Sequence, residues 1–268
     1  MDSQDRVSTT ALYTAQHWIK EGYPFAEFFD TLRGRAVYFL SVFLSYLPWV
    51  GVGIKYYNQQ LWLRHRVVEH FIETYEPDVI IDLGCGLSPR GIAHATEHSK
   101  MRVREGDLEF IVSIKKALLK TCLPQKNYQL ETFDLLQDDV ESLRAGLSPK
   151  DRVLVITEGV IDYFTFEEKK AVWSRLSELV GFFEEAVYLQ EINLTLGSPR
   201  LTQLVAWSVG VTVEDRMYST VEAGLEDLRA CGFGEVNKLA YPFDLPLEDL
   251  TPLPREAIGW EMVVAKLR

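Results

Sequence analysis

The chain of 268 residues is poor in cysteine and histidine, with three and five of them. The cysteines, Cys85, Cys122 and Cys231, are scattered and odd in number, which argues against a disulfide framework. They favour a reducing, cytoplasmic compartment. Neither a CxxC pair nor an HExxH motif is present, and the histidines lack the spacing of metal ligands, so we predict no metal site.

Positive charge is also scarce, since 28 Lys and Arg residues stand against 39 Asp and Glu residues and give a net charge of -11. Binding to a nucleic-acid backbone depends on clustered Lys and Arg, so we predict no nucleic-acid partner. The hydrophobic content of 47% and charged content of 25% are those of a globular protein with a real core. The oligomeric state is left open by the sequence.

Long apolar runs are nearly absent, and the first 16 residues lack the apolar core of a signal peptide. One uncharged segment, residues 36–54, approaches the length of a membrane-spanning helix. Pro48, Gly51 and Gly53 interrupt its second half and leave about a dozen helical residues, which is too few to span a bilayer. We predict that this helix is a buried or lid helix, with a membrane span and contact with a membrane surface as the alternatives.

The order of the predicted elements indicates the fold class. Residues 1–76 read as helical, whereas from residue 77 onward short apolar strands alternate with helices, which is typical of an α/β fold. We predict a Rossmann-like, mostly parallel sheet of seven strands with helices on both faces. The last two strand-like runs have no helix between them, so the last strand is expected to be antiparallel. The predicted domains are an N-terminal helical lid (1–76) and a sheet domain (77–268) with an irregular insertion at about 194–217.

Local signals mark several helices. Thr165 with Glu168, and Ser219 with Glu222, each form a predicted capping box at the start of a helix. In the segment LEFIVSIKKALLK, helical periodicity places one set of apolar residues on a common face: Phe110, Ile111, Ile114, Ala117 and Leu118.

A sharp corner, IDLGCGLSPRG at residues 81–91, follows the first predicted strand. Gly84 and Gly86 permit positive φ angles and leave no Cβ to block a ligand from the backbone. Ser88 is placed to cap the next helix, and Pro89 suits its first turn. The free backbone amides at such a helix start suit a carboxylate or a phosphate.

Acidic residues follow the next three strands. Asp107 comes about twenty residues after the glycines, where a carboxylate can bind the ribose hydroxyls of a nucleoside; capping the following helix is its alternative role. Asp134 and Glu158 follow the third and fourth strands. Ligands of open α/β sheets bind at the carboxyl ends of the strands, so these acids indicate a nucleotide-type ligand. A Rossmann dehydrogenase would need a third glycine where this chain has Pro89, and the Lys-Ser/Thr of a phosphate-binding P-loop is absent.

Several segments, taken in order, resemble the landmarks of the leucine carboxyl methyltransferase-like family of class I S-adenosylmethionine (SAM)-dependent methyltransferases: VSTTALYTAQ, LRHRVVEHF, VIIDLGCGLSPRG, GDLEFIVSIKKALL, ETFDLL and VLVITEGVIDYFTFEE. The family includes protein-phosphatase carboxyl methyltransferases and bacterial polyketide O-methyltransferases. The resemblance covers about residues 7–180. Ser88 and Pro89 stand where the family usually has Asp and Thr, which indicates a specialised subgroup. Arg90 matches the family's arginine in type, and a solvated position on a helix is its alternative.

The resemblance implies that SAM is the cofactor and S-adenosylhomocysteine (SAH) its product. Gly84 and Gly86 would lie under its amino-acid part, and Glu158 would close the site near the methionine amino group. Asp82 would be a further cofactor-binding residue. Arg64 would bind the methionine carboxylate, a role that Arg66 could also fill. Asp107 would bind the ribose, and Asp134 and Leu135 would border the adenine.

The acceptor is predicted from the chemistry that the sequence offers. A carboxylate nucleophile needs no base, whereas a phenol does, and no His–Asp pair with suitable spacing is present. We therefore predict methyl transfer to a carboxylate or phenol oxygen, with Tyr163 as the candidate catalytic residue in contact with the substrate or, alternatively, a packing residue. Aromatic residues of the lid predict a hydrophobic, polyketide-like substrate of secondary metabolism, bound by a set of side chains: Tyr23, Phe28, Tyr38 and Trp49. The alternatives are methylation of carbon or nitrogen, a non-methylating reaction with SAM, and a membrane-associated binding protein.

Overall fold

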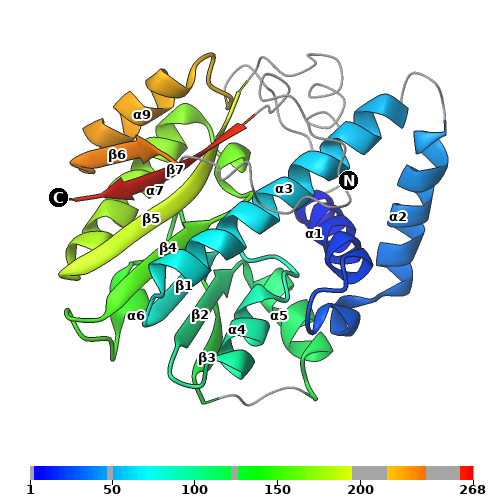
Figure 1. The fold of residues 1–268 in the computed structure, drawn as a ribbon, viewed down its shortest axis with the longest axis horizontal. Helices are drawn as coiled ribbons and strands as arrows, with labels where there is room; N and C mark the ends of the chain where they lie inside the picture. The colour runs from blue at the N-terminus through cyan, green and yellow to red at the C-terminus, as the bar shows by residue number, and fades with distance from the viewer. Residues whose placement is uncertain (1–2, 47–50, 122–125, 195–215, 240–259, 268) are drawn as a thin grey trace.

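A computed structural model describes residues 3–46, 51–121, 126–194, 216–239 and 260–267 of the chain (Figure 1). Its centre is a seven-stranded sheet with the order β3-β2-β1-β4-β5-β7-β6. The strands are β1 (Val79–Leu83), β2 (Arg102–Asp107), β3 (Tyr128–Thr132), β4 (Arg152–Thr157), β5 (Glu185–Asn193), β6 (Glu235–Lys238) and β7 (Trp260–Lys266).

The sheet is parallel from β3 through β5, and β7 runs antiparallel to both of its neighbours, β5 and β6. All five residues of β1 are buried, as expected for a central strand covered on both faces. The predicted mostly parallel sheet with an antiparallel last strand is therefore confirmed.

Helices cover both faces of the sheet, as predicted. The described helices are α1 (Ser3–Lys20), η1 (Ala26–Phe29), α2 (Leu32–Ser45), α3 (Gly51–Tyr75), α4 (Arg90–Glu97), α5 (Glu109–Leu118), α6 (Glu141–Arg144), η2 (Ile161–Tyr163), α7 (Phe166–Gly181) and α9 (Val221–Ala230). One core cluster joins the sheet to α1, η1, α3, α4 and α5, and the other joins it to α6, α7 and α9.

The N-terminal helices pack closely on the sheet. Val67, Val68 and Ile72 of α3 share a buried cluster with Ile80 of β1, so this cluster includes residues on both sides of residue 76. The division into a lid and a sheet domain at that residue stays a prediction. Most of the predicted insertion at 194–217 lies outside the described residues.

The uncharged segment forms α2 and the beginning of α3, while Pro48 lies outside the described residues. Gly34 lets α2 approach α1 closely, because a Cβ there would lie 3.1 Å from Nε2 of Gln16. Among the helices that the structure describes, none is both long enough and apolar enough to cross a membrane.

Of the two predicted capping boxes, one is confirmed and the other is wrong. The capping box of Thr165 and Glu168 at the start of α7 is confirmed, with both of its reciprocal hydrogen bonds present. The prediction of Ser219 as a cap is wrong, since the N-cap of α9 is Thr220, whose hydroxyl accepts from the N–H of Ala223. Ser and Thr are near-equivalent N-caps, so local sequence could not choose between adjacent positions.

The buried face of α5 also differs from the prediction. Ile111 is buried as expected, whereas Ile114 and Ala117 are exposed and Lys115 is fully buried. Lys115 Nζ lies 2.8 Å from Oε2 of Glu105, which is itself buried in β2. Helix α5 thus turns Lys115, and not Ile114 or Ala117, toward the interior, and hydrophobic periodicity alone does not report such an ion pair.

Candidate cofactor site

The glycine corner after β1 is shaped by its two positive-φ residues, Gly84 at 74° and Gly86 at 53°. A Cβ on Gly84 would lie 2.6 Å from Cγ2 of Val160, so this position also needs glycine for packing. A Cβ on Gly86 would meet nothing closer than Ala11 of α1, at 3.8 Å. The corner is therefore tightly packed at its first glycine and roomier at its second, beneath α1.

The start of α4 lies one residue later than predicted. Its first residue is Arg90, and its N-cap residue is Pro89, whose own side chain makes no cap hydrogen bond. The Ser88 hydroxyl accepts from the N–H of Arg90 at 3.2 Å, so the predicted serine does satisfy a donor of the first turn.

Asp107, the last residue of β2, joins the second strand to the corner. Its Oδ2 accepts from the N–H of Gly86, and its Oδ1 accepts from the N–H of Leu108, each at 2.7 Å. Burial raises the pKa of Asp107, and the two N–H donors oppose that shift. Each carboxylate oxygen keeps a further lone pair, so the group can still accept from a ligand hydroxyl.

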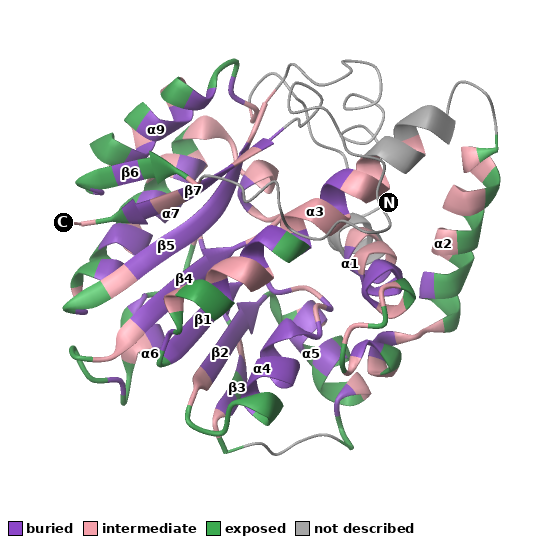
Figure 2. Ribbon diagram, in the orientation of Figure 1, coloured by how far each residue is buried: buried purple, intermediate pink, exposed green. Residues whose placement is uncertain are grey.

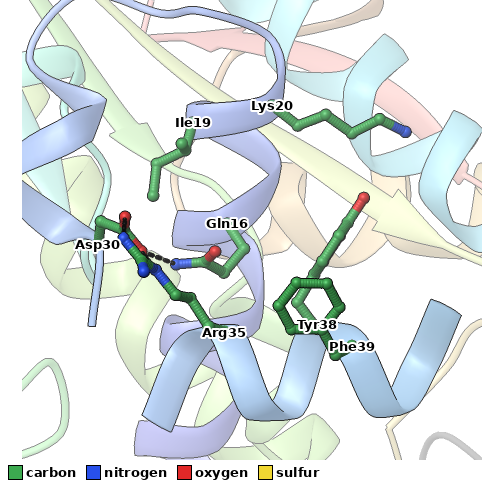
Figure 3. Close-up of a pocket in the computed structure, with 7 residues that line it drawn as sticks. All are labelled: Gln16, Ile19, Lys20, Asp30, Arg35, Tyr38 and Phe39. Atoms are coloured by element: carbon green, nitrogen blue, oxygen red, sulfur yellow. Dashed lines mark hydrogen bonds and ion pairs between the residues drawn. The ribbon is translucent and has the colours of Figure 1, made fainter. Parts of the chain in front are cut away.

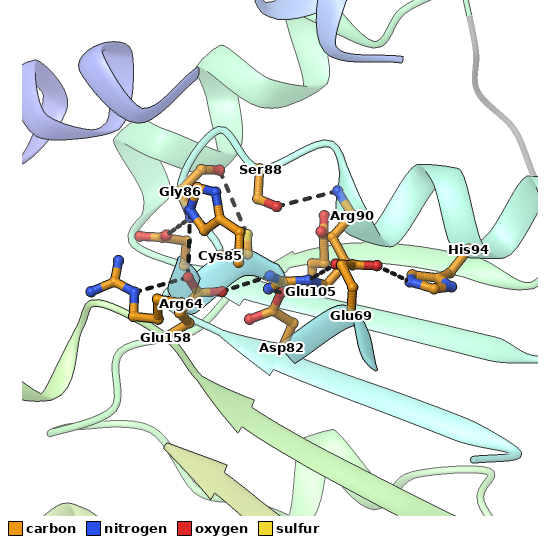
Figure 4. A network of polar contacts seen from close by, with 12 residues as sticks. Arg64, Glu69, Asp82, Cys85, Gly86, Ser88, Arg90, His94, Glu105 and Glu158 are labelled. Carbon is orange, nitrogen blue, oxygen red and sulfur yellow. Dashed lines mark hydrogen bonds and ion pairs between the residues drawn. The ribbon is translucent and has the colours of Figure 1, made fainter. Parts of the chain in front are cut away.

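Arg90 is the centre of a buried charge network (Figure 4). It is only 1% exposed. Its Nε lies 2.6 Å from Oε1 of Glu69, its Nη2 lies 2.6 Å from Oε2 of Glu158, and its Nη1 lies 3.5 Å from Oδ2 of Asp82. The alternative of a solvated Arg90 is therefore wrong, because three carboxylates compensate its charge inside the protein.

Arg64 extends the network from α3. Its Nε lies 2.9 Å from Oε1 of Glu158 and its Nη1 lies 3.3 Å from Oε1 of Glu191, which leaves Nη2 unused by these two carboxylates. Glu191 also accepts from the N–H of Gly159 at 2.6 Å. Arg66 is exposed. Of the two candidate arginines, the structure brings Arg64 to the strand ends.

The network holds more carboxylates than guanidinium groups: Glu69, Asp82, Glu158 and Glu191 surround Arg64 and Arg90. Burial raises the pKa of Asp82 to about 7, against the opposing charge of Arg90, and raises the pKa of Glu191 to about 7, against Arg64. Among the described residues, Oδ2 of Asp82 and Oε2 of Glu191 are buried without a hydrogen-bond partner. These acceptors and the excess of negative charge fit a cationic group such as an ammonium.

Glu158 behaves differently from its neighbours. Burial by itself would raise its pKa, but the charges of Arg90 and Arg64 outweigh that effect and hold the pKa well below its ordinary value. Glu158 is therefore the permanently charged member that binds both arginines.

Helix α1 covers the network with an aromatic ring. Trp18 stacks on His65 with ring centroids 3.9 Å apart, and the guanidinium of Arg90 lies 5.4 Å from the centre of the Trp18 ring. His65 Nε2 is 3.4 Å from Oε1 of Glu158, and burial lowers the pKa of His65 to about 3, so the ring is neutral. The network is thus shielded from water on the side of α1.

Two of the predicted substrate-side residues lie close to this network. The Tyr23 hydroxyl donates to Oε2 of Glu69 at 2.8 Å, so Tyr23 is a polar member of the network. Tyr163, in η2, is hydrogen-bonded to Thr10 and senses the charge of Arg64, and burial raises its pKa to about 12. Its phenol is therefore neutral at physiological pH.

The other predicted substrate residues have separate surroundings. Phe28 stacks against Phe25, with ring centroids 6.2 Å apart, and packs on a core cluster. Tyr38 of α2 meets the ring of His17 edge-on at 5.5 Å. Trp49 lies outside the described residues. The structure does not gather these side chains around one described cavity.

One cavity of about 300 Å³ lies between α1 and α2 (Figure 3). Tyr38 is the predicted substrate residue that lines it, and the lining residues are Gln16, Ile19, Lys20, Asp30, Arg35, Tyr38 and Phe39. Arg35 and Asp30 form an ion pair at its wall. The cavity is a recess between two N-terminal helices, and its lining residues differ from those of the charge network.

The two predicted adenine-side residues order the loop after β3. Asp134 Oδ1 accepts from the N–H of Leu136 at 2.8 Å, and the N–H of Asp134 donates to Asp138 at 2.7 Å. Leu135 is buried in the core cluster that contains α6 and α7. Contact of either residue with an adenine stays a prediction.

Sequence reasoning missed three members of the network: Glu69, Glu191 and His65. The signal that could have found the two acids is a charge inside an apolar run, as in VVEHF and YLQEI. A buried charge needs a partner, so a glutamate within a predicted core strand or helix face indicates a buried ion pair or a site.

Comparison with known proteins agrees with this architecture. Residues 51–177 match the family model LCM, leucine carboxyl methyltransferase. No curated protein matches the sequence. A DUF574 family protein from Streptomyces avermitilis is similar in structure with a TM-score of 0.61 at 16% identity, over 88% of this chain and 90% of that one.

Two further structures are similar at lower scores. PigF, solved with SAH, has a TM-score of 0.51 at 11% identity. A putative O-methyltransferase from Nostoc punctiforme has a TM-score of 0.54 at 11% identity. Each comparison covers 80% of this chain and 59% of the other, so the chain spans about three fifths of the length of these two proteins. At these identities the likeness establishes the fold.

The strand order, the glycine corner after β1 and the family match agree with one another. The resemblance that the sequence motifs indicated is confirmed: the chain has the fold of the class I SAM-dependent methyltransferases, and its residues 51–177 match the leucine carboxyl methyltransferase family.

Proposed function

We propose that this protein is a SAM-dependent methyltransferase that transfers a methyl group to an oxygen of a hydrophobic small molecule. The observation that carries the proposal is the buried, carboxylate-rich network beside the glycine corner. Bound SAM supplies a methyl group on a sulfonium, together with an ammonium and a carboxylate for recognition. An excess of buried carboxylates beside Arg64 suits that combination of charges.

The residues divide into roles by their chemistry. Asp82 and Glu191 each have one buried oxygen without a hydrogen bond and would accept from the ammonium. The remaining Nη2 of Arg64 would donate to the carboxylate. Asp107 would accept from the ribose hydroxyls while it holds the corner through Gly86. Asp134 and Leu135 would border the adenine.

The protein's contribution to the reaction is alignment and the exclusion of water. Aligning the acceptor with the methyl group converts a bimolecular step into an effectively unimolecular one. Trp18 and Ala11 of α1 shield the network and the corner. A carboxylate acceptor needs no base, and Tyr163, with its raised pKa, would serve as a neutral substrate contact. These features favour a carboxylate over a phenol as the acceptor.

The substrate class follows from the apolar and aromatic character of the N-terminal helices. We propose a polyketide-like acid of secondary metabolism, bound by residues that include Tyr38 and Tyr163, in the cytoplasm. Product analysis would separate this from methylation of carbon or nitrogen, because a methyl ester releases methanol in mild base whereas the other products do not.

Thermal unfolding with and without SAH tests the assignment, with NAD as the control ligand. A ligand that binds only the folded state at 100 times its Kd should add about 2.7 kcal/mol, which is a shift of a few degrees. A shift of the melting temperature with SAH, but not with NAD, supports the proposal. Saturating SAH without a shift would contradict it. Transfer of a labelled methyl group from SAM to a panel of hydrophobic carboxylic acids and phenols then identifies the acceptor oxygen.

A further inference from the structure

Exposed apolar side chains of the described residues are concentrated on one helix, α2. Of the seven large hydrophobic residues that are exposed, five lie on α2 or at its C-cap, and the other two are the least exposed of the set. The five are Leu32 (85% exposed), Phe39 (66%), Leu40 (59%), Phe43 (68%) and Tyr46 (82%).

These five side chains form one continuous stripe. Their spacing of three, four and seven residues places them on the same side of a helix. The opposite side contains Gly34 and Tyr38, which face α1. Figure 1 shows α2 at the outer side of α1, and Figure 2 shows much of its length as exposed. Most of the apolar stripe therefore faces solvent, and Phe39 at its edge also lines the cavity between α1 and α2.

The stripe is large for a monomer. Its three aromatic side chains offer roughly 200 Å² each and are two thirds exposed or more, which amounts to about 400 Å². The two leucines bring the total toward roughly 700 Å², whereas the largest apolar patch of a typical monomer is about 300–600 Å². A standard protein interface buries about 800 Å² on each partner. The stripe is therefore close to that size.

The charges around the stripe help to choose between two possible partners, a second copy of the chain and a lipid surface. No charged residue occurs from residue 36 to residue 54, and the arginines of α2, Arg33 and Arg35, both lie in its first turn. Arg35 is already paired with Asp30. In an antiparallel pair of α2 helices, this basic first turn would lie beside the uncharged end near Tyr46 of the other copy, so like charges do not meet. A two-fold interface brings the same patch of both copies together in this way.

A lipid surface fits less well. Helices that lie in a membrane surface carry Lys and Arg along their polar face, whereas the two arginines of α2, Arg33 and Arg35, are confined to its first turn. The net charge of -11 also repels anionic lipid. We propose that the outer face of α2 is the interface through which two copies of this chain form a two-fold symmetric dimer.

Sedimentation velocity across a hundredfold range of concentration tests the proposal, because the dimer population follows mass action. The wild-type chain should sediment as a dimer, and the double substitution Phe39→Gln, Phe43→Gln should sediment as a monomer. The matched control is Ile114→Gln, which changes an exposed hydrophobic residue on α5 and should stay dimeric. Each variant is also melted with and without SAH, so loss of the fold is recognised separately from loss of the dimer.

Two results would overturn the proposal. One is a wild-type chain that is monomeric at every concentration, and the other is a double variant that remains dimeric. A monomer that co-sediments with vesicles of phosphatidylcholine and phosphatidylglycerol would assign the stripe to a membrane surface instead. Because the SAH-dependent melting shift is scored independently, failure of the dimer leaves the proposed enzymatic function intact.

Discussion

Arg90 Nη2 and Glu158 Oε2 lie 2.6 Å apart inside the protein, although 68 positions separate them in the sequence. Their side chains are 2% and 7% exposed. The pair connects the start of α4, which follows β1, to the residue after β4, the strand beside β1. Most of the candidate site is organised around this contact, since Arg90 also binds Glu69 and Glu158 also binds Arg64.

Replacing Arg90 by methionine should strongly lower the free energy of unfolding. Glu69, Asp82 and Glu158 would remain buried without their shared cation, and breaking a buried pair by removing one partner costs about 3–5 kcal/mol. Urea denaturation measures the loss. The control is Arg144→Met, which removes an exposed i,i+3 pair with Glu141 and should cost at most about 1 kcal/mol. Equal effects of the two substitutions would show that the network is not a stabilising element.

Replacing Asp107 by alanine should weaken SAH binding about tenfold or more, equivalent to about 1.4 kcal/mol, without unfolding the protein. The reason is the loss of an acceptor for the ribose and of the contact that holds Gly86. Isothermal titration calorimetry measures the affinity. Asp139→Ala is the matched control, because Asp139 also accepts a backbone N–H, that of Glu141, but in an exposed loop. Unchanged affinity in Asp107→Ala would limit Asp107 to a structural role.

The two glycines of the corner should respond differently to alanine. Gly84→Ala places a Cβ 2.6 Å from Val160 and should lower the free energy of unfolding by more than about 2 kcal/mol, from overpacking and a positive φ together. Gly86→Ala meets only Ala11, at 3.8 Å, and should cost about 1 kcal/mol from its φ alone. SAH affinity should still fall in Gly86→Ala, because its Cβ would point into the space between corner and α1. Equal free energies of unfolding for the two variants would contradict the close contact between Gly84 and Val160.

SAH affinity should rise with pH near neutrality. Burial raises the pKa of Asp82 to about 7, so at neutral pH part of the free protein carries a proton there. An ammonium favours the ionised carboxylate, so the complex binds fewer protons than the free protein, and affinity increases as pH passes from about 6 to 8. Asp82→Asn should remove its part of this pH dependence when Kd is measured across that range.

Glu191→Gln provides the comparison, since burial also raises the pKa of Glu191 to about 7. If both groups face the ammonium, each single substitution should reduce the pH dependence and the double substitution should abolish it. Affinity that does not change with pH in the wild-type protein would exclude Asp82 and Glu191 as ammonium acceptors.

Local sequence determined the elements that surround the site. The run DVIIDL and the following glycines specify a buried strand and a tight corner, because both depend on the residues within a few positions. The capping box of Thr165 and Glu168 specified the start of α7 for the same reason. Asp107 was located from its spacing, since strand and helix lengths in an α/β unit are narrowly distributed.

Tertiary structure alone decided which charges are inside. On sequence grounds Arg90 was compatible with a solvated helix position, and the core position of Lys115 on α5 was missed. Whether a charge can be buried depends on partners from other elements: Glu158, after β4, for Arg90 and Glu105, in β2, for Lys115. Desolvation opposes burial unless such a partner is in place, so no local pattern reports it. The same holds for α2, whose apolar residues were evident in the sequence while the side that faces solvent was fixed only by its packing on α1.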